Sequence, residues 1–165
     1  MKKIAPPTCS APELFDLCML EMSDQGLKDR LTAQKCLVEA EYKKYAVHSG
    51  TQTWSQLERA KHGKTSQVIV GNLTKQELTD LYSKGMVASK GAARKQYDQI
   101  KLLAREECPY CGGCGEFVDD EGIGTLDHFL PKAMFPAYSV LPANLVPACA
   151  TCNTGMSFNF PIDAN

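Results

Sequence analysis

Two Cys-x-x-Cys pairs constrain this chain more than any other feature. The pairs are Cys108 with Cys111 and Cys149 with Cys152, and 37 residues separate them. Four thiolates are the number that tetrahedral Zn²⁺ requires in a closed structural site. A segment this short buries too little apolar surface to fold unaided, so the sequence predicts that zinc holds it together.

A second group of metal-binding side chains lies between and beside the cysteine pairs. Asp127 and His128 are adjacent, Asn144 lies closer to the second pair, and Asn153 directly follows Cys152. Carboxylate, amide and imidazole groups suit Mg²⁺ or another catalytic cation better than a thiolate site does. We therefore expect two metal chemistries in this part of the chain, structural Zn²⁺ and a catalytic divalent cation.

The order of these elements resembles the zinc-containing branch of the HNH endonuclease superfamily, the ββα-metal nucleases. The shared pattern is Cys-x-x-Cys, Asp-His-x-x-Pro-Lys, Asn and Cys-x-x-Cys-Asn, which spans residues 108–157 here. The resemblance implies a β-hairpin, a loop and a helix built around the metal sites. It also implies hydrolysis of phosphodiester bonds in DNA, with RNA as the second choice of polymer.

The resemblance assigns roles to individual residues. His128 would be the general base that activates water, a role that suits a neutral imidazole whose ordinary pKa is about 6.5. Asp127 and Asn153 would bind the catalytic Mg²⁺. Asn144 would orient the loop and the His128 ring, and Lys132 would contact the phosphate.

The chain departs from the family pattern at one cation. A lysine usually follows three residues after the Cys-Asn element, and this chain has Met156 there. Together with the short tail to Asn165, this predicts a truncated or divergent member with impaired catalysis. The residues around 126–132 and 140–149 are similar to HNH proteins of anti-phage defence, which often accompany an ATPase, so a partner that controls cleavage is a further expectation.

Two other functions fit parts of the pattern. A zinc-ribbon adaptor for nucleic acid or protein would use the four cysteines, but would not need Asp127, His128 and Asn153 together. A Cys-x-x-Cys redox protein would need a thioredoxin-like βαβ setting, which the sequence lacks.

Cys114 is an alternative zinc ligand to Cys111. The sequence contains no helix-turn-helix or zinc-finger pattern, so no base preference is predicted.

Charge divides the chain near residue 107. Residues 1–107 carry 17 Lys and Arg against 13 Asp and Glu, whereas residues 108–165 carry 1 against 6. An acidic nuclease module must obtain cations for the phosphate backbone from its metal, from the preceding helices or from a partner. We expect an α+β fold, mostly α, with a helical region at 1–107 for docking or nucleic-acid positioning and a zinc-stabilised ββα-metal module at 108–165.

Apolar spacing and capping patterns predict the local elements. Helices are expected at 11–22, 24–47, 74–86 and 89–107, with a connecting segment at 50–72 that Trp54 anchors. On the last helix, the basic residues that could face phosphates are Lys90, Arg94, Lys95, Lys101 and Arg105. In the module we expect paired strands at 116–118 and 123–129, a turn at 119–124, an irregular loop at 131–147 and a helix from Cys149.

The sequence contains no apolar stretch of about 18 residues that could span a bilayer. Lys2 and Lys3 precede a proline-rich segment rather than the apolar core of a secretory signal. We therefore expect a soluble, cytoplasmic protein with reduced thiols, in which Cys9, Cys18 and Cys36 are buried.

Overall fold

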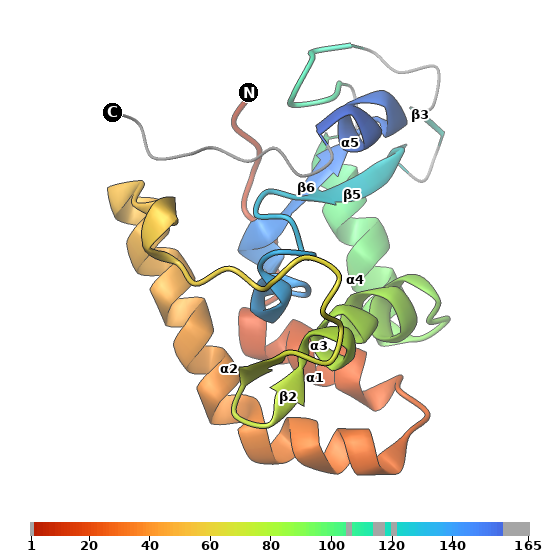
Figure 1. The fold of residues 1–165 in the computed structure, drawn as a ribbon. Coiled ribbons are helices and arrows are strands. Elements are labelled where there is room, and N and C mark those ends of the chain that lie inside the picture. The colour runs from red at the N-terminus through yellow and green to blue at the C-terminus, as the bar shows by residue number, and fades with distance from the viewer. Residues whose placement is uncertain (1, 105–106, 114–117, 120–121, 157–165) are drawn as a thin grey trace.

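In a computed structural model the chain is α+β and mostly helical, as predicted (Figure 1). The structure describes residues 2–104, 107–113, 118–119 and 122–156. The α-helices of this part are α1 (Ala11–Leu20), α2 (Gln25–Thr51), α3 (Lys75–Asp80), α4 (Ala92–Lys101) and α5 (Ala150–Met156). A π-helix, η2 (Leu81–Val87), directly follows α3. The 3₁₀-helices are η1 (Trp54–Gln56), η3 (Leu102–Ala104), η4 (Pro136–Tyr138) and η5 (Pro142–Asn144).

The described strands form two-stranded antiparallel sheets. They pair as β1 (Val68–Val70) with β2 (Leu73–Thr74), β3 (Val118–Asp119) with β4 (Gly122–Ile123), and β5 (Thr125–His128) with β6 (Leu145–Ala148). Figure 1 shows β5, β6 and α5 at one end of the molecule, α1 and α3 at the other end, and α4 running between them.

The strand expected at 123–129 pairs only partly as predicted. Val118 pairs with Ile123, as the expected hairpin of 116–118 with 123–129 requires, and residues 116–117 lie outside the described residues. From Thr125 onward the expected partner is wrong, because β5 pairs with β6, which lies mostly in the segment expected to be an irregular loop. The segment Leu145–Ala148 was difficult to recognise as a strand because it is buried throughout, without the alternation of a half-buried strand, and contains Pro147. A two-stranded sheet tolerates proline because one side of each strand needs no ladder hydrogen bond.

Capping side chains begin the first two helices where the sequence predicts. Ser10 and Glu13 form a capping box at α1, and the carboxylate of Asp24 accepts a hydrogen bond from the Leu27 N–H at the start of α2. The predicted ends are less accurate. Helix α1 stops two residues earlier than expected, whereas α2 continues past Gly50 to Thr51. The following residue, Gln52, caps α2 in the left-handed conformation with φ 54°.

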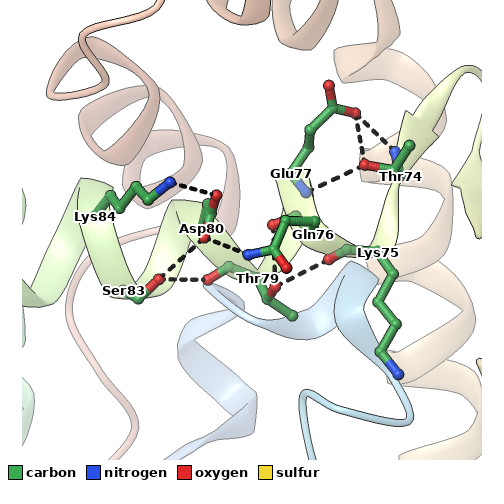
Figure 2. A network of polar contacts seen from close by, with 8 residues as sticks. All are labelled: Thr74, Lys75, Gln76, Glu77, Thr79, Asp80, Ser83 and Lys84. Atoms are coloured by element: carbon green, nitrogen blue, oxygen red, sulfur yellow. Dashed lines mark hydrogen bonds and ion pairs between the residues drawn. The ribbon is translucent and has the colours of Figure 1, made fainter. Parts of the chain in front are cut away.

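The helix expected at 74–86 is present in two forms. Thr74 and Glu77 form the predicted capping box, in which the Glu77 carboxylate accepts from the Thr74 N–H at 2.8 Å (Figure 2). The second half is the π-helix η2, and Lys84 pairs with Asp80 across the junction at 2.8 Å (Figure 2). Gly85 allows η2 to approach α1, since a Cβ at this position would lie 2.5 Å from the Cys18 carbonyl oxygen.

The helix expected at 89–107 is shorter than predicted. It begins after Gly91, and Ser89 lies outside the helix, where its hydroxyl accepts a hydrogen bond from the Gly91 N–H. Helix α4 ends at Lys101, which is 6% exposed, so the expectation that Lys101 faces phosphates is wrong. Arg105, the other basic residue expected near the end of this helix, lies outside the described residues.

A shared hydrophobic cluster joins the helices to the following segment. It includes Phe15 of α1, Leu78 of α3, Leu126 of β5 and Leu145 of β6. Helix α4 contacts both β5 and β6. Described residues on both sides of position 107 therefore belong to the same core, and the division into two domains stays a prediction.

The segment between α2 and β1 is anchored by Trp54, as predicted. This side chain is 6% exposed, and its ring contacts those of Tyr45 and Phe129, with centroid separations of 5.2 and 5.4 Å. Aromatic pairs at this distance add to the stabilisation that burial alone supplies. The indole therefore ties the connecting segment to α2 and to the residue that follows β5.

Two of the three thiols expected to be buried are so. Cys9 and Cys18 are buried, but Cys36 is exposed, so that expectation is wrong. The buried face of α2 carries Leu31, Val38, Tyr42 and Tyr45, and Cys36 falls outside this helical spacing.

Across the described residues, none of the helices has both the length and the apolar character that a membrane span needs.

Candidate functional site

The four cysteines of the two Cys-x-x-Cys pairs come together in space. Cys108 and Cys111 follow η3, Cys149 precedes α5, and Cys152 lies in its first turn. Their Sγ atoms all lie within 4.8 Å of one another, so the cluster could hold a metal ion such as zinc. The alternative ligand, Cys114, lies outside the described residues.

Backbone N–H groups favour a thiolate at one of these cysteines. Burial raises the pKa of Cys108, but hydrogen bonds from the backbone of Cys149, Cys111 and Tyr110 outweigh it and lower the pKa to about 7. The Cys149 N–H lies 3.4 Å from the Cys108 Sγ. Burial and the neighbouring thiols raise the pKa of Cys152. These hydrogen bonds therefore favour the thiolate form of Cys108, which is the form that binds metal.

A pocket beside the cysteine cluster contains most of the other predicted site residues. The pocket has a volume of about 320 Å³, and Asp127, His128, Lys132 and Asn153 line it. Strand β5 delivers the first two and α5 delivers Asn153. The entry to β5 requires glycine, because Gly124 has φ +26° and a Cβ there would lie 2.9 Å from the Ala148 carbonyl oxygen.

Asp127 and Asn153 lie on the same face of β5. Alternate residues of a strand point to the same side, so Thr125 and Asp127 share a face. The Asn153 amide donates to the Thr125 hydroxyl at 2.7 Å, which places Asn153 on this same face. The Tyr110 hydroxyl, between the first two cysteines, donates to the Asp127 carboxylate at 2.9 Å. Residues next to both halves of the cysteine cluster thus contact the strand that carries Asp127.

The His128 ring is held by a backbone carbonyl. Its Nε2 atom lies 2.9 Å from the Ser139 carbonyl oxygen, which can only accept a hydrogen bond. Nε2 therefore carries the proton of the neutral ring, and Nδ1 keeps a lone pair. Burial and the nearby Lys132 charge lower the pKa of His128 to about 3, although the contact with Ser139 opposes this shift. The imidazole is therefore neutral near pH 7.

Asn144 organises the loop between β5 and β6. Its side-chain oxygen accepts from the Leu130 N–H at 2.8 Å, and its amide nitrogen donates to the carbonyl oxygens of Leu130 and Tyr138, each at 3.1 Å. The residue is fully buried. These contacts hold the loop next to Ser139, whose carbonyl oxygen contacts the His128 ring. The effect of Asn144 on the orientation of that ring stays a prediction.

Two tyrosines from the helical region line the same pocket. The Tyr82 ring lies edge-on to His128, and the Lys132 ammonium lies 5.1 Å from the centroid of the Tyr82 ring. Tyr97 of α4 completes this wall. Nothing in the sequence distinguished Tyr82 and Tyr97 from ordinary core residues, because aromatic side chains at helical spacing are usually core. The sequence also contains no signal for Tyr110 and Ser139, because their roles depend on contacts between segments far apart in the chain.

Comparison with known proteins gives a phage relative. The chain is similar to "Protein ea31" of Escherichia phage lambda, with 31% identity over 155 residues. The alignment covers 94% of this chain and 50% of that protein, so the chain spans about half the length of this curated relative. No family model matches the chain. No solved structure matches it either. The name of the relative states no activity, so function must be inferred from the site.

Proposed function

We propose that this protein is a metal-dependent endonuclease of the HNH type that hydrolyses phosphodiester bonds, in DNA rather than in RNA. The observation that carries the proposal is that Asp127, His128, Lys132 and Asn153 line one pocket beside the cysteine cluster. These residues come from a strand, a loop and a helix. A general base, two oxygen ligands and a cation are the groups that metal-assisted phosphodiester hydrolysis requires.

His128 is suited to take a proton from the attacking water. Its Nε2–H is committed to the Ser139 carbonyl, so Nδ1 is the basic atom of the ring. Burial keeps the ring neutral, so that it can accept a proton, but the same lowered pKa makes it a weaker base than a free imidazole. The ring is also fixed in place, because Ser139 is 1% exposed and its hydroxyl donates to the Leu78 carbonyl oxygen of α3. Rigid placement of the base is the main contribution of this arrangement.

Asp127 and Asn153 would hold the catalytic cation. Their side chains lie on the same face of β5 and supply oxygen ligands, which suit Mg²⁺ or Mn²⁺. When bound, such a cation stabilises the leaving oxygen and the additional negative charge of the transition state. Tyr110 restrains Asp127 through its hydroxyl. Outer hydrogen bonds of this kind orient metal ligands.

The cysteine cluster would hold structural zinc. Through this ion it would also fix the position of the residues that contact Thr125 and Asp127 of β5. Tyr110 lies between Cys108 and Cys111, and Asn153 follows Cys152. A zinc ion that fixes the four cysteines would therefore also fix the residues that contact Thr125 and Asp127. In this proposal the structural ion supports catalysis by position alone.

The test is cleavage by the purified chain of residues 1–165. Supercoiled plasmid and a structured RNA would be incubated with Mg²⁺ or Mn²⁺, with EDTA added in parallel reactions. We expect nicking or linearisation of the plasmid in the presence of either cation and no product in EDTA. Cleavage of RNA alone would show that RNA, and not DNA, is the substrate. Full activity in EDTA would contradict the requirement for a catalytic divalent cation.

Cleavage in the same measurement would exclude the adaptor. An adaptor for nucleic acid or protein would bind zinc at the cysteine cluster and cleave neither polymer. A role in anti-phage defence and control by an ATPase partner stay predictions. They would be supported if cleavage by the isolated chain were slow and a co-purified partner accelerated it.

A further inference from the structure

Two cations and two aromatic rings form a row that follows one wall of the pocket and continues past its edge. The Lys132 ammonium lies 5.1 Å from the centroid of the Tyr82 ring, and the Arg94 guanidinium lies 4.7 Å from that of the Tyr97 ring. The Tyr82 and Tyr97 rings are neighbours, with 6.4 Å between their centroids. We call Lys132, Tyr82, Tyr97 and Arg94 the cation–aromatic row. It begins beside His128 and leads away from it along η2 and α4.

Arg94 lies at the outer end of the row. Lys132, Tyr82 and Tyr97 line the pocket, and Arg94 lies beyond Tyr97. One of its terminal nitrogens, Nη1, donates to the Val87 carbonyl oxygen at 3.0 Å, and Val87 is itself a pocket residue. The Arg94 side chain is 33% exposed. Its guanidinium is therefore held at the pocket edge and reached by solvent.

Within the described part of the chain, the contacts of Arg94 leave donors for a ligand. Nε donates to the two carboxylate oxygens of Asp98, at 3.1 and 3.3 Å, and Nη1 donates to Val87. A guanidinium has five N–H donors in a planar fork, so these contacts occupy only part of it. The unused edge can form the paired hydrogen bonds with which arginine recognises phosphate oxygens.

We propose that Arg94 binds the phosphate backbone of the nucleic-acid substrate. This assignment rests on the proposed nuclease function and adds the path of the substrate to it. Lys132 would contact the backbone near His128, and Arg94 would contact it where the strand leaves the pocket over Tyr97. Because Arg94 lies outside the pocket, it is a substrate-positioning residue and not a catalytic one.

Of the basic residues predicted on this helix, the structure singles out Arg94. Lys101 is buried, and Lys90 and Lys95 are exposed. Arg94 is the one that stacks on a pocket residue. Lys95, the next residue of α4, is therefore a matched control that removes one positive charge from the same helix.

The experiment measures binding without cleavage. Fluorescence anisotropy would be recorded with zinc-loaded protein, without chelator and without added Mg²⁺ or Mn²⁺, on a short labelled DNA duplex and a labelled RNA hairpin. We expect Arg94→Ala to weaken binding about tenfold, as loss of a charged hydrogen bond does, and to lower the salt dependence by about one phosphate contact. Lys95→Ala should stay within about twofold of the parent, since an exposed charge contributes weakly.

Asp98 provides a variant whose effect has the opposite sign. If Arg94 acts only through its ion pair within α4, Asp98→Ala would weaken binding as Arg94→Ala does. If Arg94 binds phosphate, Asp98→Ala removes a competing carboxylate and should tighten binding about two- to fivefold. That gain should disappear in the double variant Arg94→Ala/Asp98→Ala, which excludes a long-range charge effect.

The outcomes separate this inference from the nuclease proposal. Equal binding by Arg94→Ala and Lys95→Ala would overturn the role of Arg94, even if the parent cleaves DNA in a manner that requires His128. Weaker binding by Arg94→Ala alone would support the role, even if no cleavage is found. Failure of the parent chain to bind either polymer would overturn it as well. In a cleaving enzyme, Arg94→Ala should raise KM and leave kcat within about twofold, because it removes binding outside the reacting centre.

Discussion

The ring of Tyr82 meets the ring of His128 edge to face, with 4.4 Å between their centroids. Tyr82 belongs to the π-helix η2, in the part of the chain predicted to be a docking or positioning region, whereas His128 is the predicted base. The Tyr82 hydroxyl also donates to the Leu126 carbonyl oxygen at 3.2 Å. The helices therefore form part of the pocket wall. A segment that begins at residue 108 would lack this wall.

Tyr82→Phe should lower stability. The Leu126 carbonyl oxygen points out of the two-stranded ladder, and the buried Tyr82 hydroxyl supplies its donor from outside the sheet. Loss of a buried hydrogen bond of this kind costs about 1 to 2 kcal/mol. We expect a lower free energy of unfolding in urea, measured by tryptophan fluorescence.

Tyr42→Phe is the matched control for that change. Within the described residues, the Tyr42 hydroxyl is buried and has no hydrogen-bond partner. Its removal should be neutral or stabilise the protein by up to about 1 kcal/mol, because an unpaired buried polar group is costly. Equal destabilisation by Tyr42→Phe and Tyr82→Phe would contradict the importance of the Tyr82 hydrogen bond.

Cys149→Ser should release the metal from the cysteine cluster. Cys149 is one of the four thiols within 4.8 Å of one another, whereas Cys36 is an exposed thiol of α2 outside the cluster. We expect about one zinc per chain in the parent and in Cys36→Ser, and a large loss in Cys149→Ser, measured by elemental analysis. The thermal midpoint should fall with the zinc content. Parent-like zinc content in Cys149→Ser would show that the metal binds elsewhere.

Asn144→Ala should be strongly destabilising. The side chain is fully buried and forms three hydrogen bonds with the backbone of Leu130 and Tyr138. Removal leaves buried backbone groups unpaired, which costs about 3 kcal/mol or more. The control is Asn72→Ala, at an exposed turn position between β1 and β2, where we expect a change of about 0.5 kcal/mol or less. Similar unfolding free energies for both variants would argue against a role for Asn144 in holding the loop.

Two glycine substitutions should have opposite effects. Gly85→Ala would place a Cβ 2.5 Å from the Cys18 carbonyl oxygen, so η2 and α1 must separate. Such overpacking costs about 1 to 3 kcal/mol. At Gly50 of α2 an added Cβ meets nothing within 4 Å, so Gly50→Ala should stabilise the helix by about 0.5 to 1 kcal/mol. Thermal unfolding distinguishes the two, and stabilisation by Gly85→Ala would show that this approach is not tight.

Local signals in the sequence predicted the helices well and the small sheets poorly. Capping boxes at Ser10 and Thr74 depend on residues three apart, so they were visible without the structure. The pairing of β5 with β6 depends on a 16-residue loop whose path is set by Asn144 and by packing on the helices. The second strand carries a proline and no alternation, so its pairing could be found only from the assembled core.

The candidate site was predictable to a similar degree. Spacing was sufficient to predict the cysteine cluster, because ligands of one ion must converge whatever the fold. The pocket residues Asp127, His128, Lys132 and Asn153 were found through the resemblance of the motif. Tyr82, Tyr97 and Tyr110 could not be found in this way, since their contacts with the site depend on how η2, α4 and the first cysteine loop pack against β5.

The most direct test of the nuclease proposal is the rate of plasmid cleavage by His128→Ala in Mg²⁺ or Mn²⁺. The control is His48→Ala, since His48 bonds to Thr53 at the end of α2 and does not line the pocket. Loss of a general base lowers rates about 10² to 10⁴-fold, so we expect this loss in His128→Ala and a parent-like rate in His48→Ala. Cleavage by His128→Ala at the rate of the parent would contradict the proposed role of His128 and, with it, the proposed nuclease site.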